Sequence, residues 1–263
     1  MENVVDTDIY TFLKQYIGKE IMYVPNPGNA GDSLIAFGTL KVFDEIGLNY
    51  SIGNHTVTYT NKLLFFGGGG NFVGLYPQCR SFFKNNMSNN TIVLLPHTIK
   101  DENELIESFN DNIIIICRER ESYNYVYSII KNKNNVLLSK DMAFYIKDID
   151  NYKLIKGDGI CNCFRTDKEK TEIAIPSNNI DLSRKLSMAN NTSHKDIIEK
   201  VSLSIFEYLS KYDTINTNRL HMAIAGSLLN KRVHFYPNSY YKNKAVYEYS
   251  IKDVFMNTNY EYS

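Results

Sequence analysis

An arginine and a histidine, Arg219 and His221, stand two positions apart at the start of the apolar stretch 220–229. A guanidinium is permanently charged, and its planar fork of donors matches a carboxylate or a phosphate. An imidazole exchanges a proton near neutral pH. The pair is therefore suited to hold an anionic substrate and to protonate it, provided that other segments of the chain face it.

The loop at residues 26–33 leads from an apolar run into a helical pattern and contains two glycines. Asp32 or Ser33 could cap the helix, and the glycines let the backbone approach a ligand closely. An ordinary turn before a helix explains this segment equally well. It is not a dinucleotide fingerprint, because the G-x-G-x-x-G spacing is absent.

Four consecutive glycines at residues 67–70, followed by Asn71, come directly after the apolar run 63–66. So many glycines are costly in chain entropy, and a plain turn rarely needs them. A loop whose amides face the anion or the hydroxyls of a ligand explains them better. Gly68, Gly69 and Asn71 are therefore predicted to contact that ligand.

Three further polar residues follow predicted strands. His97 is one of them, although a lone histidine is more often structural than catalytic. Arg118 directly follows an apolar strand and is a better ligand candidate than Arg120, which fits a charged helix start. Asp141 could orient a cation or accept a hydrogen bond from a sugar hydroxyl.

The loop 236–243 combines aromatic, amide and amine groups, among them Tyr240 and Lys242. Such groups suit a loop that faces a ligand. The signal is weak, because tyrosine-rich loops occur throughout this chain.

Short apolar runs alternate with helical patterns over the first 145 or so residues. The predicted strands are 21–24, 60–66, 92–95 (closed by Pro96), 113–117 and 136–138, and the predicted helices are 33–46 and 119–131. This alternation predicts a parallel sheet with helices on its faces. Functional residues of such sheets gather at the carboxyl ends of the strands, so the loops there should form a cleft. A cleft of this kind favours an enzyme over a scaffold.

The second part of the chain begins with a polar, weakly patterned segment at 151–193. It contains one strand candidate, 159–164; the later elements are a helix at 194–212, a strand beginning at 214–215, a helix at 220–229 and a strand at 232–235. We predict an N-terminal Rossmann-like lobe over residues 1–150 and a smaller one over 151–263. The smaller lobe carries Arg219 and His221.

Composition narrows the class of protein. The 263 residues include 29 Lys and Arg and 29 Asp and Glu, and this balance argues against bulk nucleic-acid binding. The four cysteines are irregularly spaced, and Cys161-x-Cys163 has no matching second pair, so a zinc site is not expected. No signal peptide is visible and no apolar run is long enough to cross a bilayer, so a cytoplasmic protein is expected.

Taken in order, six segments of the chain resemble the polysaccharide pyruvyltransferase family. They are residues 28–32, 67–71, 95–97, 118–122, 141–144 and 217–224. Each motif alone is weak, whereas the ordered set is fairly specific and spans nearly the whole chain. The resemblance implies two Rossmann-like lobes in a GT-B-like arrangement, and a role in making surface polysaccharides such as exopolysaccharide or capsule.

The resemblance also implies a reaction. Members of the family move the enolpyruvyl unit of phosphoenolpyruvate onto a sugar, usually as a cyclic ketal across two hydroxyls. By motif, Arg118, Arg219 and His221 match family positions tied to the donor and to catalysis. With them we group Gly68, Gly69 and Asn71 at the donor, and Asn29, Asp32, Tyr240 and Lys242 at the acceptor.

The chemistry of that reaction agrees with these residue types. Phosphoenolpyruvate carries a carboxylate and a phosphate, for which two arginines from opposite lobes are natural clamps. His221 is the candidate general acid, and either His97 or Asp141 could be the base toward the acceptor hydroxyl. No cofactor and no metal are expected. The acceptor would be a saccharide or a lipid-linked oligosaccharide, which would bring the protein to the inner face of the membrane.

Two other functions remain open from the sequence. A GT-B glycosyltransferase with a nucleotide-sugar donor would share the fold, but it should show an acidic residue for the ribose and a base-stacking pocket, neither of which can be assigned. A non-catalytic sugar-binding assembly protein would keep the fold and lose the Arg219 and His221 pair.

Overall fold

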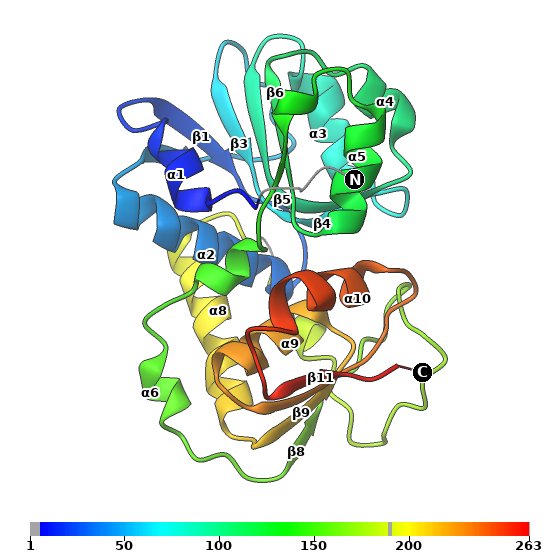
Figure 1. The fold of residues 1–263 in the computed structure, drawn as a ribbon. Helices are drawn as coiled ribbons and strands as arrows, with labels where there is room; N and C mark the ends of the chain where they lie inside the picture. Colours follow the sequence, from blue (N-terminus) through cyan, green and yellow to red (C-terminus); the bar gives the residue numbers. More distant parts are fainter. Residues whose placement is uncertain (1–5, 189–190, 263) are drawn as a thin grey trace.

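Two parallel β-sheets, each with its own helices, form the computed structural model, which describes residues 6–188 and 191–262 (Figure 1). The strands of the larger sheet lie in the order β2-β1-β3-β5-β6-β7, and β4 pairs with β5. These strands are β1 (Glu20–Val24), β2 (Asn49–Ile52), β3 (Leu63–Phe66), β4 (Gly69–Val73), β5 (Thr91–Lys100), β6 (Ile113–Cys117) and β7 (Val136–Leu138). The predicted α/β class with parallel sheets is confirmed.

Consecutive side chains of a strand point to opposite faces of the sheet, and helices cover both faces of the larger sheet. Phe65 packs into the core that includes α1 (Ile9–Lys14) and α2 (Ala30–Ile46), whereas Phe66 packs into the core on the other face. That second face is covered by α3 (Gln78–Asn86), α4 (Asn103–Glu107) and α5 (Arg120–Ile129). This explains why the strands read as continuous apolar runs rather than as alternating ones.

The smaller sheet has four strands in the order β11-β10-β9-β8, all parallel. They are β8 (Ile160–Asn162), β9 (Thr214–Thr217), β10 (Arg232–Phe235) and β11 (Thr258–Tyr260). The remaining helices of this part are α6 (Asp150–Lys153), α7 (Leu182–Lys185), α8 (Lys195–Ser210), α9 (Leu220–Leu228), α10 (Lys242–Val246) and the π-helical turn η3 (Tyr247–Ile251). Two 3-10 turns, η1 (Lys133–Asn135) and η2 (Met142–Tyr145), flank β7 in the first part.

Helix α2 joins the two sheets. Asn29 caps it in a reciprocal capping box with Asp32, and Gly47 ends it with a left-handed φ of 71°. The helix is buried along most of its length, because it packs on the larger sheet and also against α8 and α9 (Figure 1). One hydrophobic core therefore runs from the first sheet to the second, and the lobe boundary at residue 150 stays a prediction.

Strand β5 was expected to end at Pro96, and that expectation is wrong. The strand continues to Lys100, with a register shift between Leu94 and His97. Before this irregularity β5 pairs with β3, and after it β5 pairs with β4. A proline has no N–H to donate to a ladder, so it is tolerated where the ladder changes partner.

The glycine run is part of the sheet rather than a free loop. Gly69 and Gly70 begin β4, and Gly67 and Gly68 connect it to β3. A Cβ on Gly67 would lie 2.5 Å from the backbone nitrogen of Asn26, and one on Gly68 would lie 2.6 Å from the carbonyl of Pro96. These two glycines are therefore required by the close approach of neighbouring backbone segments.

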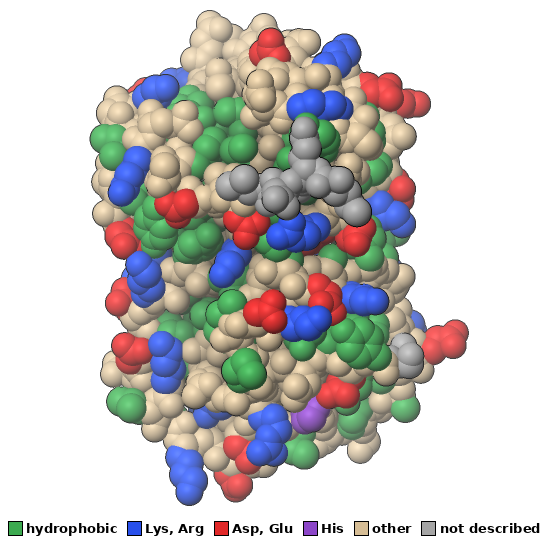
Figure 2. Space-filling model, viewed as in Figure 1, with side chains coloured by type: hydrophobic (Ala, Val, Ile, Leu, Met, Phe, Trp, Pro, Cys, Tyr) green, Lys and Arg blue, Asp and Glu red, His purple; other side chains and the backbone are tan. Residues whose placement is uncertain are grey.

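The surface carries charges of both signs. Lys and Arg alternate with Asp and Glu over the face shown in Figure 2, with no broad field of one sign. Within the described part of the chain, no helix has the length and the apolar character needed to cross a membrane.

Candidate active site

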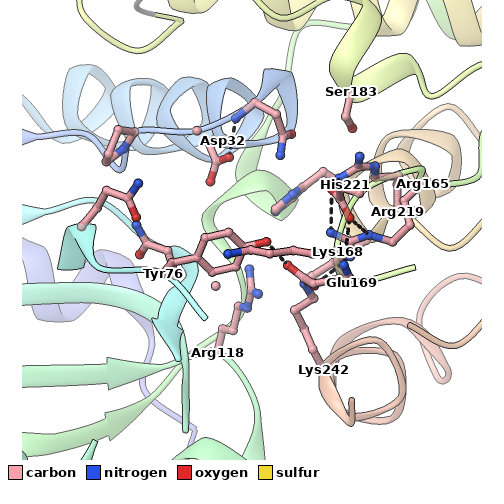
Figure 3. A pocket seen from close by; sticks show the side chains of 18 residues that line it. Asp32, Tyr76, Arg118, Arg165, Lys168, Glu169, Ser183, Arg219, His221 and Lys242 are labelled. Atoms are coloured by element: carbon pink, nitrogen blue, oxygen red, sulfur yellow. Dashed lines mark hydrogen bonds and ion pairs between the residues drawn. The ribbon is translucent and has the colours of Figure 1, made fainter. Parts of the chain in front are cut away.

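The carboxyl ends of strands from both sheets meet around one pocket of about 450 Å³ (Figure 3). This is the place where parallel α/β sheets present functional side chains. The described residues that line it are Pro27, Gly28, Asn29, Asp32, Gly70, Asn71, Tyr76, Gln78 and Arg118 from the first part of the chain, and Arg165, Asp167, Lys168, Glu169, Ser183, Arg219, Leu220, His221 and Lys242 from the second.

Arg118 emerges directly from the end of β6 and is almost fully buried. Its Nε donates to Thr98 Oγ1 at 2.8 Å, and its Nη1 donates to Asp141 Oδ2 at 2.8 Å. The Nη2 group lies beside Gly70, where a Cβ would come within 2.8 Å of it. Gly70 thus leaves open the space in front of Nη2, and this edge of the guanidinium faces the pocket.

Asp141 links Arg118 to His221. It follows β7, and its Oδ1 accepts a hydrogen bond from the Ala143 backbone at 2.9 Å. Its Oδ2 lies 3.3 Å from His221 Nε2 in addition to its bond with Arg118. Burial alone would raise the pKa of Asp141, but the charges of His221 and Arg118 outweigh it and hold this pKa well below its usual range. Asp141 is therefore an ionised carboxylate that orients both partners.

Asp32 brings a second carboxylate to the pocket, at the first turn of α2. Its Oδ2 accepts from the Asn29 backbone at 2.9 Å and its Oδ1 from Asn26 Nδ2 at 3.0 Å. Burial raises the pKa of Asp32, although nearby cations, of which His221 is the strongest, act against this. Asp32 is consequently a stronger base than an ordinary aspartate. Unlike Asp141, it lines the pocket.

Arg219 reaches the pocket with its guanidinium already engaged. Its Nε and Nη2 form a bidentate pair with Asp181 at 2.9 and 2.7 Å, and its Nη1 lies 2.8 Å from Asp167 Oδ2. Arg165 is held in a similar way, by Asp167 and Glu169. Two arginines and three carboxylates thus form one network, and all of its members except Asp181 line the pocket.

Lys242 extends this network toward Arg118. Its Nζ lies 2.5 Å from Glu169 Oε2, and Tyr76 donates its hydroxyl hydrogen to Glu169 Oε1 at 2.7 Å. Figure 3 shows Tyr76 reaching across the pocket from the first sheet to Glu169. Burial, assisted by the charges of Arg165 and Arg118, lowers the pKa of Lys242 to about 8 despite Glu169. Lys242 is therefore a cation whose charge is easily lost.

His97 lies behind the pocket wall. Its ring is fully buried, and its Nε2 lies 3.0 Å from Asn71 Oδ1, while Asn71 Nδ2 donates to Asn26 Oδ1 at 2.5 Å. Burial and the charge of Arg118 lower the pKa of His97 to about 3, so the ring is neutral at neutral pH. His97 orients Asn71, which does line the pocket.

Three other predicted residues also lie outside the lining. Gly68 and Gly69 are buried against Pro96 and Asn26, so their amides do not form a ligand loop at the pocket surface. Tyr240 contributes indirectly, since its ring lies 5.0 Å from the ammonium of Lys242. The structure does bring together Arg118, Arg219, His221, Asn29, Asp32, Asn71 and Lys242.

The sequence prediction missed the segment from Arg165 to Glu169 and the residue that it meets, Tyr76. Lys168 donates to the Leu75 carbonyl and its Nζ lies 4.0 Å from the centre of the Tyr76 ring, so this segment bridges the two sheets. One signal was present: the charged residues follow the strand predicted at 159–164, and strand ends are where site residues gather.

No group of three or more His, Cys, Asp or Glu side chains among residues 6–188 and 191–262 is arranged to hold a metal ion. The pocket instead brings positively charged side chains together. Five Lys or Arg side chains line it, together with His221. Its chemistry is that of an anion site with an attached acid–base group.

Known proteins match this chain over most of its length. The sequence profile of the family described as "Polysaccharide pyruvyl transferase" matches residues 29–240. "Putative pyruvyl transferase EpsO" of Bacillus subtilis (strain 168) is 29% identical over 270 residues, which cover 85% of this chain and 83% of that protein. "Pyruvyl transferase 1" of Schizosaccharomyces pombe is 26% identical over 170 residues, 54% of this chain and 42% of that protein.

A solved structure shares the fold. It is the crystal structure of a functionally uncharacterised protein of Klebsiella pneumoniae, with 34% sequence identity, a TM-score of 0.86 and 97% of each chain covered. The matched region 29–240 contains every residue of the Arg118, Asp141 and His221 cluster. On the extent of this match, the chain belongs to the polysaccharide pyruvyl transferase family.

Proposed function

We propose that this protein transfers the pyruvyl group of phosphoenolpyruvate to two hydroxyls of a saccharide, forming a ketal and releasing phosphate. The observation that carries the proposal is the shared carboxylate of Asp141. Its Oδ2 binds Arg118 at 2.8 Å and lies 3.3 Å from His221 Nε2, so that an anion-binding group and a proton donor are held side by side in one pocket.

The donor would bind among the cations. Arg118 and Lys242 both line the pocket beside Gly70, where a Cβ would lie 2.8 Å from Arg118 Nη2 and 3.5 Å from Lys242 Cδ. Both side chains are buried, so their attraction for an anion is weakly screened by solvent. Arg219 also lines the pocket, with its guanidinium held in place by Asp167 and Asp181.

His221 would deliver a proton to the methylene carbon of the donor. Its Nε2 lies 3.3 Å from Asp141 Oδ2, and this carboxylate holds the ring in position at the pocket. As the new C–H bond forms, the adjacent carbon becomes electrophilic and a sugar hydroxyl attacks it. The C–O bond to phosphate then breaks, the second hydroxyl attacks the same carbon to close the ketal, and its proton is taken up by the departing phosphate.

A base must accept the proton of the attacking hydroxyl. His97 is neutral, but Asn71 separates it from the pocket. Asp141 has a lowered pKa and is already bound to two partners. Asp32 lines the pocket and its pKa is raised. We therefore assign the base role to Asp32, and a positioning role to Asp141.

The alternative donor is a nucleotide-sugar. Tyr76 is an aromatic residue of the pocket lining, but Lys168 Nζ lies over one face of its ring and its hydroxyl is bonded to Glu169, so at most one face is left for a base. Family membership also favours pyruvyl transfer.

The test is to incubate the purified protein with phosphoenolpyruvate and a panel of lipid-linked and synthetic saccharides. The expected result is release of phosphate that depends on the acceptor, together with an acceptor product that has gained one pyruvate ketal by mass spectrometry. Sugar transfer from a nucleotide-sugar, with no phosphate released from phosphoenolpyruvate under any acceptor, would overturn the proposal.

A further inference from the structure

A second hollow, of about 540 Å³, lies directly beside the pocket and shares Pro27 and Gly28 with it. It is formed where β1 and β2 end, with Pro25 on one strand and Ile52 and Gly53 on the other. Because β2 and β1 are neighbours at the edge of the larger sheet, the hollow continues the pocket along the same carboxyl edge.

A ridge at Pro27 and Gly28, which line both spaces, separates them. The absence of a Cβ at Gly28 makes room for the Asp32 carboxylate, because a Cβ there would lie 2.0 Å from Asp32 Oδ2. The ridge is also held in place, since Asn191 Nδ2 donates to the Gly28 carbonyl at 3.0 Å. A ligand that occupies both spaces would therefore pass over Pro27 and Gly28.

The two spaces differ in charge. Five Lys or Arg and three Asp or Glu side chains line the pocket, whereas none of the described residues that line the hollow is Lys, Arg, Asp or Glu. Burial lowers the pKa of His55, which also keeps that ring uncharged at neutral pH. An anion would find no countercharge here, so the hollow suits a neutral ligand.

The side chains of the hollow suit a polyhydroxyl ligand. Asn54 brings an amide group, and His55 and His194 bring imidazole groups, which both donate and accept hydrogen bonds. The amide of Asn191 is already bonded to the Gly28 carbonyl and to the Met188 backbone N–H. The ring of Tyr59 is fixed by its hydroxyl, which bonds the backbone N–H and carbonyl of Asn54 at 2.8 and 3.1 Å. A fixed aromatic face beside amide groups can pack on the C–H face of a sugar while its hydroxyls are bonded.

We infer that this hollow binds neutral sugar units of the acceptor that adjoin the sugar receiving the pyruvyl group. The inference rests on the proposed function and adds the place of the acceptor's further sugar units, in a neutral hollow outside the reaction pocket. The reacting sugar occupies the charged pocket, and its neighbours extend over Gly28 into the hollow.

The test compares acceptors of different length. We would measure KM and kcat for a neutral trisaccharide acceptor and for its terminal monosaccharide, with wild-type protein and with a double variant, His55→Ala and His194→Ala. These two histidines lie outside the reaction pocket. His234→Ala is the matched control, because His234 lies on β10 and pairs with Glu261.

The expected result is a KM for the trisaccharide that rises about fivefold or more in the double variant, since two hydrogen-bonding groups are lost. The KM for the monosaccharide, the KM for phosphoenolpyruvate and kcat should stay unchanged. Equal effects on both acceptors, or no effect on either, would overturn the inference while leaving the proposed function standing.

If the wild-type protein turns over no acceptor, the proposed function has failed and direct binding decides the inference. Met22 lines the hollow, so its ¹³C-labelled methyl group reports on occupancy by NMR. A shift of this methyl on titration with neutral glucose- or galactose-containing trisaccharides, lost in the double variant, supports the site. A Met22 methyl that does not move with any of them excludes it.

Discussion

Asp141 Oδ2 lies 3.3 Å from His221 Nε2, although the two residues are 80 positions apart in the chain. Asp141 follows a strand of the larger sheet and His221 begins a helix of the smaller one. The same oxygen accepts a hydrogen bond from Arg118 at 2.8 Å. A shift of either sheet relative to the other would therefore separate the proton donor from the anion-binding arginine, and several consequences of this geometry can be measured.

Replacing His221 by alanine should abolish the reaction without unfolding the protein. A general acid contributes about 10²–10⁴-fold to a rate, so kcat should fall by at least that factor. His221 is partly exposed at the pocket, and its removal leaves no large cavity in the core. The melting temperature should change little. A marked drop in melting temperature would instead identify His221 as a structural histidine.

Asp141→Asn should damage both stability and activity. The carboxylate of Asp141 and the guanidinium of Arg118 are 0% and 1% exposed, so the substitution leaves a buried cation without its countercharge. Breaking such a pair costs about 3–5 kcal/mol of unfolding free energy. Denaturant titration measures this loss. Asp150→Asn is the control: the Asp150 side chain is 81% exposed in its pair with Lys153, so its substitution should cost almost no unfolding free energy.

Gly70→Ala should weaken donor binding while the fold is kept. The new methyl group would lie 2.8 Å from Arg118 Nη2 and push the guanidinium from its position. We expect the KM for phosphoenolpyruvate to rise about tenfold, because small displacements of a clamp are costly. Gly74→Ala is a matched control, as the nearest heavy atom to its Cβ is 3.9 Å away. Equal KM values for the two variants would contradict the role of Arg118.

Donor binding should weaken as the pH rises through about 8. Burial lowers the pKa of Lys242 from 10.5 to about 8, so the side chain is charged below that pH and neutral above it. The dissociation constant for phosphoenolpyruvate, measured by calorimetry, should therefore increase between pH 7 and pH 9. Lys242→Arg keeps its charge throughout this range and should remove the step. A step that persists in this variant would assign the titration to another group.

The lowered pKa of Lys242 should also make the unfolding free energy depend on pH. Its folded pKa lies below its unfolded pKa of 10.5, so between about pH 8 and 10.5 the unfolded chain binds more protons at this site. The contribution of Lys242 to the unfolding free energy should rise with pH across this window. Comparing wild-type protein with Lys242→Arg over the same window isolates this contribution, because the arginine does not titrate there.

Tyr76→Phe should affect the donor site more than it affects the fold. The substitution removes a single hydrogen bond to Glu169, worth about 1 kcal/mol. Tyr10→Phe removes a comparable bond to Glu45 at the surface, far from the pocket residues. The two variants should have similar unfolding free energies, and only Tyr76→Phe should raise the KM for phosphoenolpyruvate. If both leave that KM unchanged, the bridge from Tyr76 to Glu169 does not position Lys242.

Much of the architecture follows from local patterns. The strands Ile113–Cys117 and Val136–Leu138 and the start of the helix at Leu220 lie where the apolar runs predict them. Buried parallel strands are continuous apolar runs, and such a signal does not depend on distant residues. The strands β2, β4 and β11 were missed. They are short, and β4 begins with glycines that have no strand propensity.

The sequence by itself determined which residue types would surround the pocket. Arg118, Asp141, Arg219 and His221 each follow a strand, and in parallel sheets this position alone directs a residue to the carboxyl edge. The ordered motifs also indicated the family, which the profile match over residues 29–240 established.

Only the tertiary structure decided how those residues are paired. Arg219 bonds to Asp181, which is 38 positions away in the chain, and Tyr76 bonds to Glu169, which is 93 positions away. The acidic partners come from a segment without apolar periodicity, whose path is set by contacts with both sheets rather than by local propensity. Whether a cation is free for a ligand or held by the protein's own carboxylates depends on such distant contacts, so the chain order alone cannot reveal it.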